Sequence, residues 1–176
     1  MATTISFGLS QKEIKQAIKQ LERYKVGFNR KLEIYVRRLM EIGHVKAADC
    51  LGQLNIGRTV RLKTDIEPMV NGCRGILIGI GKDITNDYGT INTLLLIEFG
   101  AGIHHNPTDN PKAAELGMGV GTFPGQTHSF DDGGWFYLND NDEWVHTYGT
   151  KATMPMFNAS REIILRAREI AKDVFK

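Results

Sequence analysis

The 176-residue sequence contains few cysteines and no long apolar run. Its two cysteines, Cys50 and Cys73, do not make a disulfide framework in a chain of this length, and we expect both to pack as small buried residues. The longest apolar runs, such as residues 94–97, are far too short to span a bilayer. The first residues lack the basic start and apolar stretch of a secretory signal peptide. We therefore expect a protein made in a reducing cytoplasm, without a membrane partner.

The sequence also lacks the motifs of common catalytic and ligand sites. Residues 117–121 are glycine-rich but lack the Gly-Lys-Ser/Thr ending of a phosphate-binding loop, and no Gly-x-Ser-x-Gly occurs. Residues 140–143 carry carboxylates but lack the central glycine of a calcium loop. His104 and His105 share a segment with three aspartates, Asp109, Asp131 and Asp132. A metal-dependent hydrolase built on them is our third hypothesis, because their spacing is not that of a zinc site; we expect no enzyme activity, cofactor or metal.

Charge is unevenly distributed along a chain whose composition is that of one soluble domain. The net charge is only +2, and 41% of residues are hydrophobic. Residues 1–51 hold ten Lys/Arg against five Asp/Glu, whereas residues 104–134 hold one lysine against four acids. A basic helical end and an acidic loop can complement each other between copies of the chain, although a solvated basic helix face is the simpler explanation. We expect a single domain over residues 1–176, with a flexible leader over residues 1–9.

The N-terminal third has the pattern of two amphipathic helices. Ser10 and Glu13 form a capping box, a signature of a helix start. Apolar residues then follow at helical spacing, at Ile14, Ala17, Ile18 and Leu21. Gly27 permits a break, and a second apolar pattern runs over residues 28–53, with a weak point at Gly43.

The remainder predicts strands, one long loop and a last helix. Five segments show the alternation or apolar run of strands: 58–65, 75–80, 91–99, 135–138 and 143–148. The strand over 91–99 is expected to be central, because its middle is wholly apolar, and the last two strands form a hairpin with a polar turn at 139–142. Residues 100–134, with 8 of the 19 glycines, form a long loop with one short turn of helix at 112–116. Pro155 suits the first turn of a C-terminal helix.

These elements predict an α+β fold. Strands and helices do not alternate, which disfavours a doubly wound parallel sheet. We expect an antiparallel or mixed β-sheet packed by two N-terminal helices and one C-terminal helix, with a long glycine-rich loop.

Two segments that bracket this loop carry a family resemblance. They are residues 96–100 (LIEFG) and residues 149–159 (GTKATMPMFNA), which lead into the last helix. With the amphipathic N-terminal helices, they resemble the minor tail-component or tail-completion proteins of long-tailed bacteriophages, typified by the tenth gene product of a lambda-like siphophage. Residues 119–128 and 134–137 are similar to a longer-loop branch of that family. The resemblance covers about residues 10–176.

The resemblance implies a structural protein of the virion neck or upper tail. Such proteins form rings, commonly of six copies, that join the head connector to the tail or complete it, and they perform no reaction. The implied partners are further copies of the chain and the connector, tail-terminator or tail-tube proteins; DNA would be met only as it passes through the neck.

The contacts of such a ring join two different surfaces of neighbouring copies. Our candidates are the long loop, through Phe123, Phe130 and Trp135, and the basic first helix; the aromatic residues can equally pack the loop onto its own domain. The helix contributes four cations, Lys12, Lys15, Lys19 and Arg23. The alternative function is DNA binding through the basic helices. A helix-turn-helix is disfavoured because residues 58–64, the only segment for its recognition helix, alternate like a strand.

Overall fold

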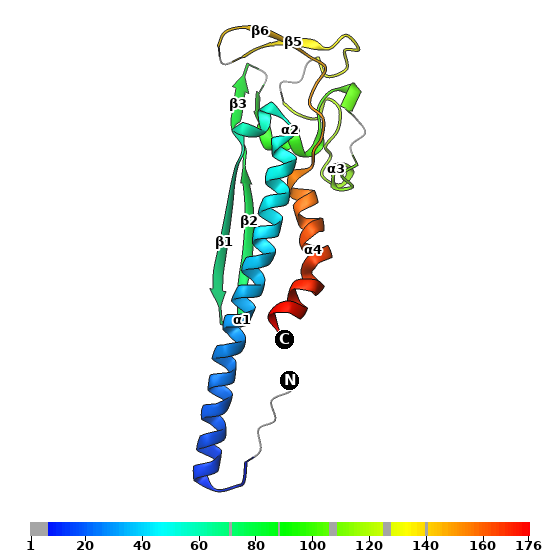
Figure 1. Ribbon diagram of the computed structural model, residues 1–176. Coiled ribbons are helices and arrows are strands. Elements are labelled where there is room, and N and C mark those ends of the chain that lie inside the picture. Colours follow the sequence, from blue (N-terminus) through cyan, green and yellow to red (C-terminus); the bar gives the residue numbers. More distant parts are fainter. Residues whose placement is uncertain (1–6, 71, 88, 106–108, 125–127, 140) are drawn as a thin grey trace.

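The chain forms an elongated stalk with a head at one end (Figure 1). The computed structural model describes residues 7–70, 72–87, 89–105, 109–124, 128–139 and 141–176, the side chain of Asn86 excepted. The stalk consists of α1 (Gln11–Gly52), β1 (Arg61–Met69), β2 (Gly72–Ile80) and α4 (Pro155–Val174). We use "head" for residues 83–150, which fold around the end of α1 where that helix stops. Residues 1–6 of the predicted leader lie outside the described part of the chain.

The first helix is one continuous element of 42 residues, so the two helices predicted at the N-terminus are wrong. It begins as predicted, because the Ser10 hydroxyl oxygen accepts a hydrogen bond from the backbone N–H of Glu13 at 3.3 Å. Gly27 does not break it, since Leu21 and Phe28 are seven residues apart and lie on the same face two turns from each other. The two apolar patterns are therefore a single stripe in register.

Gly43 is a packing position and not a weak point of the helix. A Cβ atom at this buried residue would lie 2.6 Å from Ile163 Cδ1 in α4 and 3.3 Å from Leu77 Cδ2 in β2. Three elements of the stalk approach one another closely here, and only glycine leaves the space for them. Gly27 differs, because no atom lies within 4 Å of the place its Cβ would take.

The strands pair in three separate antiparallel hairpins within the described residues, instead of one sheet. In the stalk, β1 pairs with β2 from Arg61↔Ile80 to Met69↔Gly72. The head contains β3 (Asp83–Asn86) with β4 (Gly89–Asn92), and β5 (Trp135–Leu138) with β6 (Trp144–Thr147). The α+β class, the antiparallel pairing, the hairpin over residues 135–148 and the C-terminal helix are confirmed. Asp140 of its predicted turn lies outside the described residues.

The strand predicted over residues 91–99 is wrong beyond Asn92. Asn92 caps a short helix, α2 (Thr93–Phe99), by accepting a hydrogen bond from the backbone N–H of Leu94 at 3.0 Å. Thr93 and Ile97, one helical turn apart, are completely buried. A run of four apolar residues fits a buried helix as well as a buried strand, so periodicity could not separate the two.

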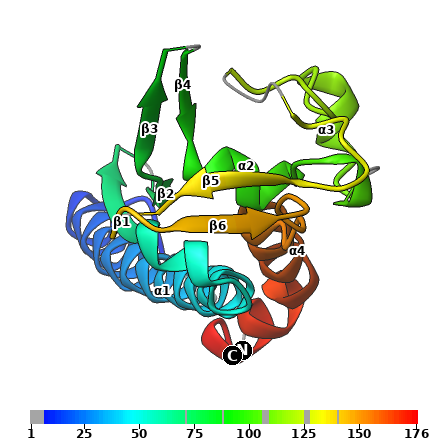
Figure 2. The ribbon, with the colours of Figure 1, turned by 90° about the horizontal axis from the view of Figure 1, so that it is seen from above.

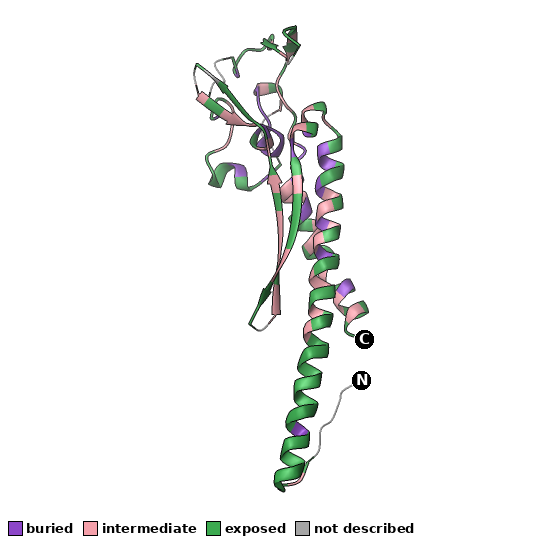
Figure 3. Cartoon of the chain, turned by 90° about the vertical axis from the view of Figure 1, so that its left-hand side faces the viewer, coloured by how far each residue is buried: buried purple, intermediate pink, exposed green. Residues whose placement is uncertain are grey.

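The head surrounds a compact apolar core beside the end of α1. Its buried members are Leu96, Phe99, Ala101, Ala113 and Phe123. The predicted long loop, of which residues 106–108 and 125–127 lie outside the description, runs over this core and contains α3 (Lys112–Glu115), the short turn of helix expected there. The β5–β6 hairpin lies across the end of the head (Figure 2). Buried residues gather where α1 meets the head and α4, whereas the opposite end of α1 is almost wholly exposed (Figure 3).

Candidate functional site

The two segments that bracket the long loop meet in space through a buried carboxylate. Glu98 Oε2 accepts a hydrogen bond from the backbone N–H of Met156 at 2.9 Å, and Oε1 accepts from the backbone N–H of Phe157 at 3.0 Å. Oε1 also accepts from the amide of Asn110 in the loop, at 2.9 Å. Met154, the N-cap residue of α4, has no capping bond from its own side chain. Glu98, 58 positions before Met156, therefore caps α4, and its carboxylate interacts favourably with the N-terminal dipole of that helix.

Backbone hydrogen bonds add to these contacts on both sides of Glu98. We call the bonds of Glu98 together with these backbone bonds the joint. Ile97 O accepts from the backbone N–H groups of Thr153 and Met154, at 3.0 and 3.3 Å. Ala101 and Thr150 exchange two hydrogen bonds, of 2.8 and 2.9 Å. Burial raises the pKa of Glu98 above its ordinary value of 4.5, and the three bonds to its carboxylate oppose this rise without cancelling it. The sequence motifs thus form a structural joint that holds the head to α4.

The histidines of the loop are engaged in ordinary polar contacts. His104 Nε2 lies 2.8 Å from the carbonyl oxygen of Asp132, and His128 Nδ1 lies 2.9 Å from Asp131 Oδ2. Burial, with the neighbouring charges of His104 and Lys151, lowers the pKa of His105. Among the described residues no three His, Cys, Asp or Glu side chains gather where they could hold a metal ion. The described residues therefore give no support to the third hypothesis, a metal-dependent hydrolase.

A surface hollow of about 380 Å³ lies between the end of α1 and the start of β1. Its polar lining comes from His44, Asn55 and Arg58, and the His44 Nδ1 atom has no hydrogen-bond partner within the described chain. None of the described lining residues is a carboxylate, a serine or a cysteine. The hollow therefore offers neither a nucleophile nor a carboxylate general base.

The most distinctive surface is the free end of α1, residues 11–27, which we call the arm. We call the rest of the described protein the body. It ends where the C-terminus of α4 contacts α1: the ring centroids of Phe175 and Phe28 are 5.6 Å apart, and Lys31 Nζ donates to the carbonyl oxygen of Lys176 at 3.0 Å. Beyond this point α1 continues for roughly 25 Å at 1.5 Å per residue. No described helix or strand packs against it (Figure 3), and every one of its residues except Ala17 is exposed.

The arm carries an apolar stripe between cationic residues. Ile14, Ile18 and Leu21 are 39–54% exposed and continue the stripe that Phe28 begins to bury in the body. The four cations predicted as contact residues all lie on this arm and are all exposed: Lys12, Lys15, Lys19 and Arg23. The arm is thus an amphipathic helix whose apolar side has no helical or sheet partner among the described elements.

A second exposed surface lies at the opposite end of the molecule, on the outer side of the β5–β6 hairpin. We call it the aromatic face; its members are Phe136, Leu138, Trp144, His146 and Tyr148. Cross-strand pairing places Phe136 opposite His146 and Leu138 opposite Trp144. The rings of Phe136, His146 and Tyr148 follow one another with centroids 4.8 Å apart. Trp144 is 71% exposed, which is unusual for so large an apolar side chain.

The three loop aromatics predicted as contact residues have different positions. Phe123 is buried in the core of the head, so it packs its own domain and is not available to a partner. Trp135 is half-buried on the inner side of the hairpin, beside Gly102. Phe130 alone of the three is largely exposed. Phe136 and Trp144 were not predicted as contact residues. The alternation of side chains along residues 135–138 and 144–148 was the signal that places them together on one side of the hairpin.

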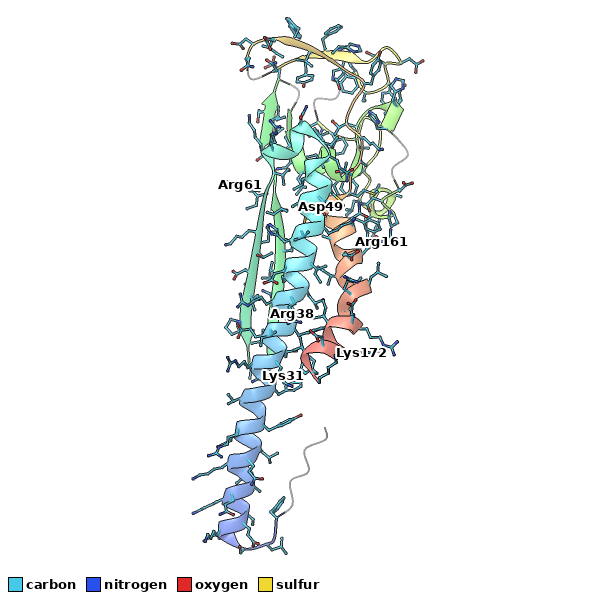
Figure 4. All side chains as sticks on the ribbon, viewed as in Figure 1. Lys31, Arg38, Asp49, Arg61, Arg161 and Lys172 are labelled. Carbon is cyan, nitrogen blue, oxygen red and sulfur yellow. The ribbon has the colours of Figure 1, made fainter. Side chains whose placement is uncertain are left out.

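Charge separates along the length of the molecule. Residues 83–150, the head, hold ten acidic residues and one lysine, a formal charge of −9. The rest of the chain holds 21 Lys/Arg against ten acids, a formal charge of +11. Cations are spread along the stalk (Figure 4), at Lys31, Arg38, Arg61, Arg161 and Lys172. An acidic head thus stands at one end of a basic stalk and arm.

Within the described part of the chain, no helix combines the length and apolarity needed to cross a bilayer. No protein-family model, no curated protein and no solved structure matches this chain.

Proposed function

We propose that this chain is a non-enzymatic structural protein that works by assembling into a ring of copies. In the setting that its family resemblance implies, it is a component of the neck or upper tail of a long-tailed bacteriophage virion. There it joins the head connector to the tail, or completes the tail, by binding connector, tail-terminator or tail-tube proteins.

One observation carries this proposal: the apolar stripe of α1 does not stop where the body of the protein stops. Ile14, Ile18 and Leu21 stay about half exposed, so covering the remainder of each side chain is worth about 1 kcal/mol, or about 3 kcal/mol together. A stripe of this kind on a surface helix is normally covered. A partner molecule is the natural cover, because the described chain supplies none.

The joint at Glu98 supports an assembly role in a second way. It fixes α4, the loop and α2 to one another through bonds of 2.9–3.0 Å. Because α1 also packs on α4 around Gly43, the arm and the head are held in a defined relation. A closed ring requires such fixed geometry between the two contact surfaces of each copy.

Sedimentation velocity over a range of concentrations, followed by negative-stain imaging, tests the proposal. We expect concentration-dependent oligomers, and ring-shaped particles in the images. The double variant Ile18→Lys/Leu21→Lys is expected to reduce assembly at least tenfold, while the thermal unfolding midpoint of the body stays unchanged. Val26→Lys is the matched control, because Val26 is an exposed arm residue outside the stripe. A protein that remains monomeric at 100 µM, alone and with purified connector and tail proteins, contradicts the proposal.

DNA binding is the second candidate, supported by the exposed cations of the arm. A helix-turn-helix with its recognition helix at residues 58–64 stays disfavoured, because a 3-10 turn over Asn55–Thr59 leads directly into β1. A basic helix can still contact phosphates without reading sequence. A gel shift with duplex DNA that weakens steeply with salt would favour this candidate, and the absence of a shift at low salt would eliminate it.

A further inference from the structure

The geometry points to one specific contact: the arm of one copy docks on the aromatic face of a second copy. This inference rests on the proposed assembly function and goes beyond it by naming the two surfaces and their chemistry. The partner of the arm is another molecule of the same chain.

The two surfaces complement each other in both apolar and charged groups. The arm offers an aliphatic stripe, and the aromatic face offers rings centred on Trp144. Cations flank the stripe, whereas acidic residues flank the rings. Asp142 and Glu143 directly precede Trp144 in the sequence. The segment that contains Asp132 also lies beside the rings: the Asp132 carbonyl oxygen is 2.8 Å from His104 Nε2, and the Gly133 carbonyl oxygen is 2.8 Å from His146 Nε2. Apolar groups can therefore meet apolar groups while Lys and Arg reach carboxylates or ring faces.

The arm cannot reach the aromatic face of its own molecule. The two surfaces lie at opposite ends of the long axis, and the continuous helix between them keeps them apart (Figure 1). Two arms are poor partners for each other, because residues 11–27 carry five Lys/Arg and two Glu, a formal charge of +3 on each copy. Like charges that face each other across an interface are destabilising. The charge pattern therefore favours arm against head over arm against arm.

Another acidic surface exists and supplies the matched control. A hollow on the stalk is lined by Glu41, Asp49 and Glu162, with Lys46 among them. Arg166 lies 3.7 Å from Glu162, so part of this charge is already compensated within the chain. Its described lining includes two apolar residues, Ile42 and Val45, but no aromatic ring. It is a weaker match for the arm than the hairpin is.

A contact between the two ends of the molecule is heterologous: each copy gives its arm to one neighbour and its aromatic face to another. Such contacts produce a closed ring when the rotation between neighbours closes, and an open filament when it does not. The inference therefore predicts that arm and face are used in equal numbers, once per copy.

Charge reversal with the full-length protein tests the contact. Lys15→Glu/Lys19→Glu reverses the charge of the arm. Asp142→Lys/Glu143→Lys reverses the charge of the acidic pair that precedes Trp144, which we call the rim of the aromatic face. Each variant alone is expected to weaken self-association, measured by sedimentation velocity at low salt, by roughly tenfold or more. An equimolar mixture of the two is expected to regain association, because the reversed arm meets the reversed rim and the unchanged surfaces meet each other. The control Glu41→Lys/Asp49→Lys is expected to associate like the wild-type protein.

Trp144→Ser tests the same contact without a change of charge. It is expected to weaken association without changing the unfolding midpoint, because the side chain is exposed in the monomer. Wild-type association that survives both reversals overturns the arm–face contact and leaves the assembly function standing. If the control Glu41→Lys/Asp49→Lys loses association while both charge-reversal variants keep it, the arm binds the stalk hollow. This result also overturns the arm–face contact. A wild-type protein that does not associate at all, either alone or with purified connector and tail proteins, refutes the assembly function itself.

Discussion

Replacing Glu98 by glutamine should show how strongly the joint holds the head to α4. The carboxylate accepts three hydrogen bonds with both of its oxygens. Glutamine has almost the same shape but only one acceptor oxygen, so its NH₂ group must face the backbone N–H of Met156 or that of Phe157. One donor at the N-terminus of α4 then loses its partner, at a cost of about 1–3 kcal/mol. We expect the free energy of unfolding at pH 7 to fall by about 2 kcal/mol, and the melting temperature by about 4–8 °C.

The same variant gives a pH dependence of definite sign. In the unfolded chain Glu98 titrates near its ordinary value of 4.5, and burial raises its pKa above this value in the folded state. Between the two values the folded state binds more protons than the unfolded state, so the free energy of unfolding falls as the pH rises through this window. Glutamine does not titrate. The stability advantage of wild-type protein over Glu98→Gln is therefore expected to be larger at pH 4.5 than at pH 7.

Urea unfolding at several pH values, followed by circular dichroism, measures both effects. Glu115→Gln is the control, because Glu115 is an exposed glutamate that pairs with Lys112 on the surface. We expect it to change stability by less than about 0.5 kcal/mol. Two results would contradict this role of Glu98: a Glu98→Gln variant as stable as wild type at pH 7, or a stability advantage of wild type that grows from pH 4.5 to pH 7. The second result would show that the bonds to the carboxylate outweigh its burial.

Three further substitutions test other parts of the structure. Gly43→Ala is expected to lower the free energy of unfolding by about 1–3 kcal/mol, seen in urea unfolding, because the new methyl group meets Ile163. Gly27→Ala is expected to slow amide exchange in the arm, since alanine is favoured over glycine by about 1 kcal/mol in an exposed helix; unchanged exchange would contradict a helical arm. Phe123→Ala is expected to cost about 3–5 kcal/mol by the same unfolding assay, and a near-neutral result would contradict its place in the core.

The sequence was a good guide where local pattern decides structure. The N-cap at Ser10, the hairpin over residues 135–148 and the helix start at Pro155 each depend on neighbouring residues, and each is found as expected. Gly27 was misleading because glycine lowers helix propensity by only about 1 kcal/mol, which a helix anchored in a packed body tolerates. The continuous register of the apolar stripe on either side of it was the better signal.

The errors and omissions concern contacts between distant segments. Residues 94–97 are helical because Asn92 caps them and the head covers them on several sides, and an apolar run alone does not contain that information. Glu98 was recognised as part of a motif, but its bonds to Met156 and Phe157 required the fold. The surfaces proposed for docking were only half predicted. The cations of the arm were found, whereas the exposed face of the hairpin was not, since exposure depends on how the hairpin lies on the head.

The unbroken first helix has a mechanical consequence for any assembly that the protein enters. At 1.5 Å per residue its 42 residues span about 63 Å, with one end packed beside the head and the other free. A rotation of the whole stalk by about 5° about its head end displaces the free end of α1 by about 5 Å, which is one helical turn. The position of the arm tip is therefore sensitive to small changes of angle in the head. Binding at the tip would in turn restrict the angles that the head can adopt, so successive copies could be aligned across a distance much longer than any single contact.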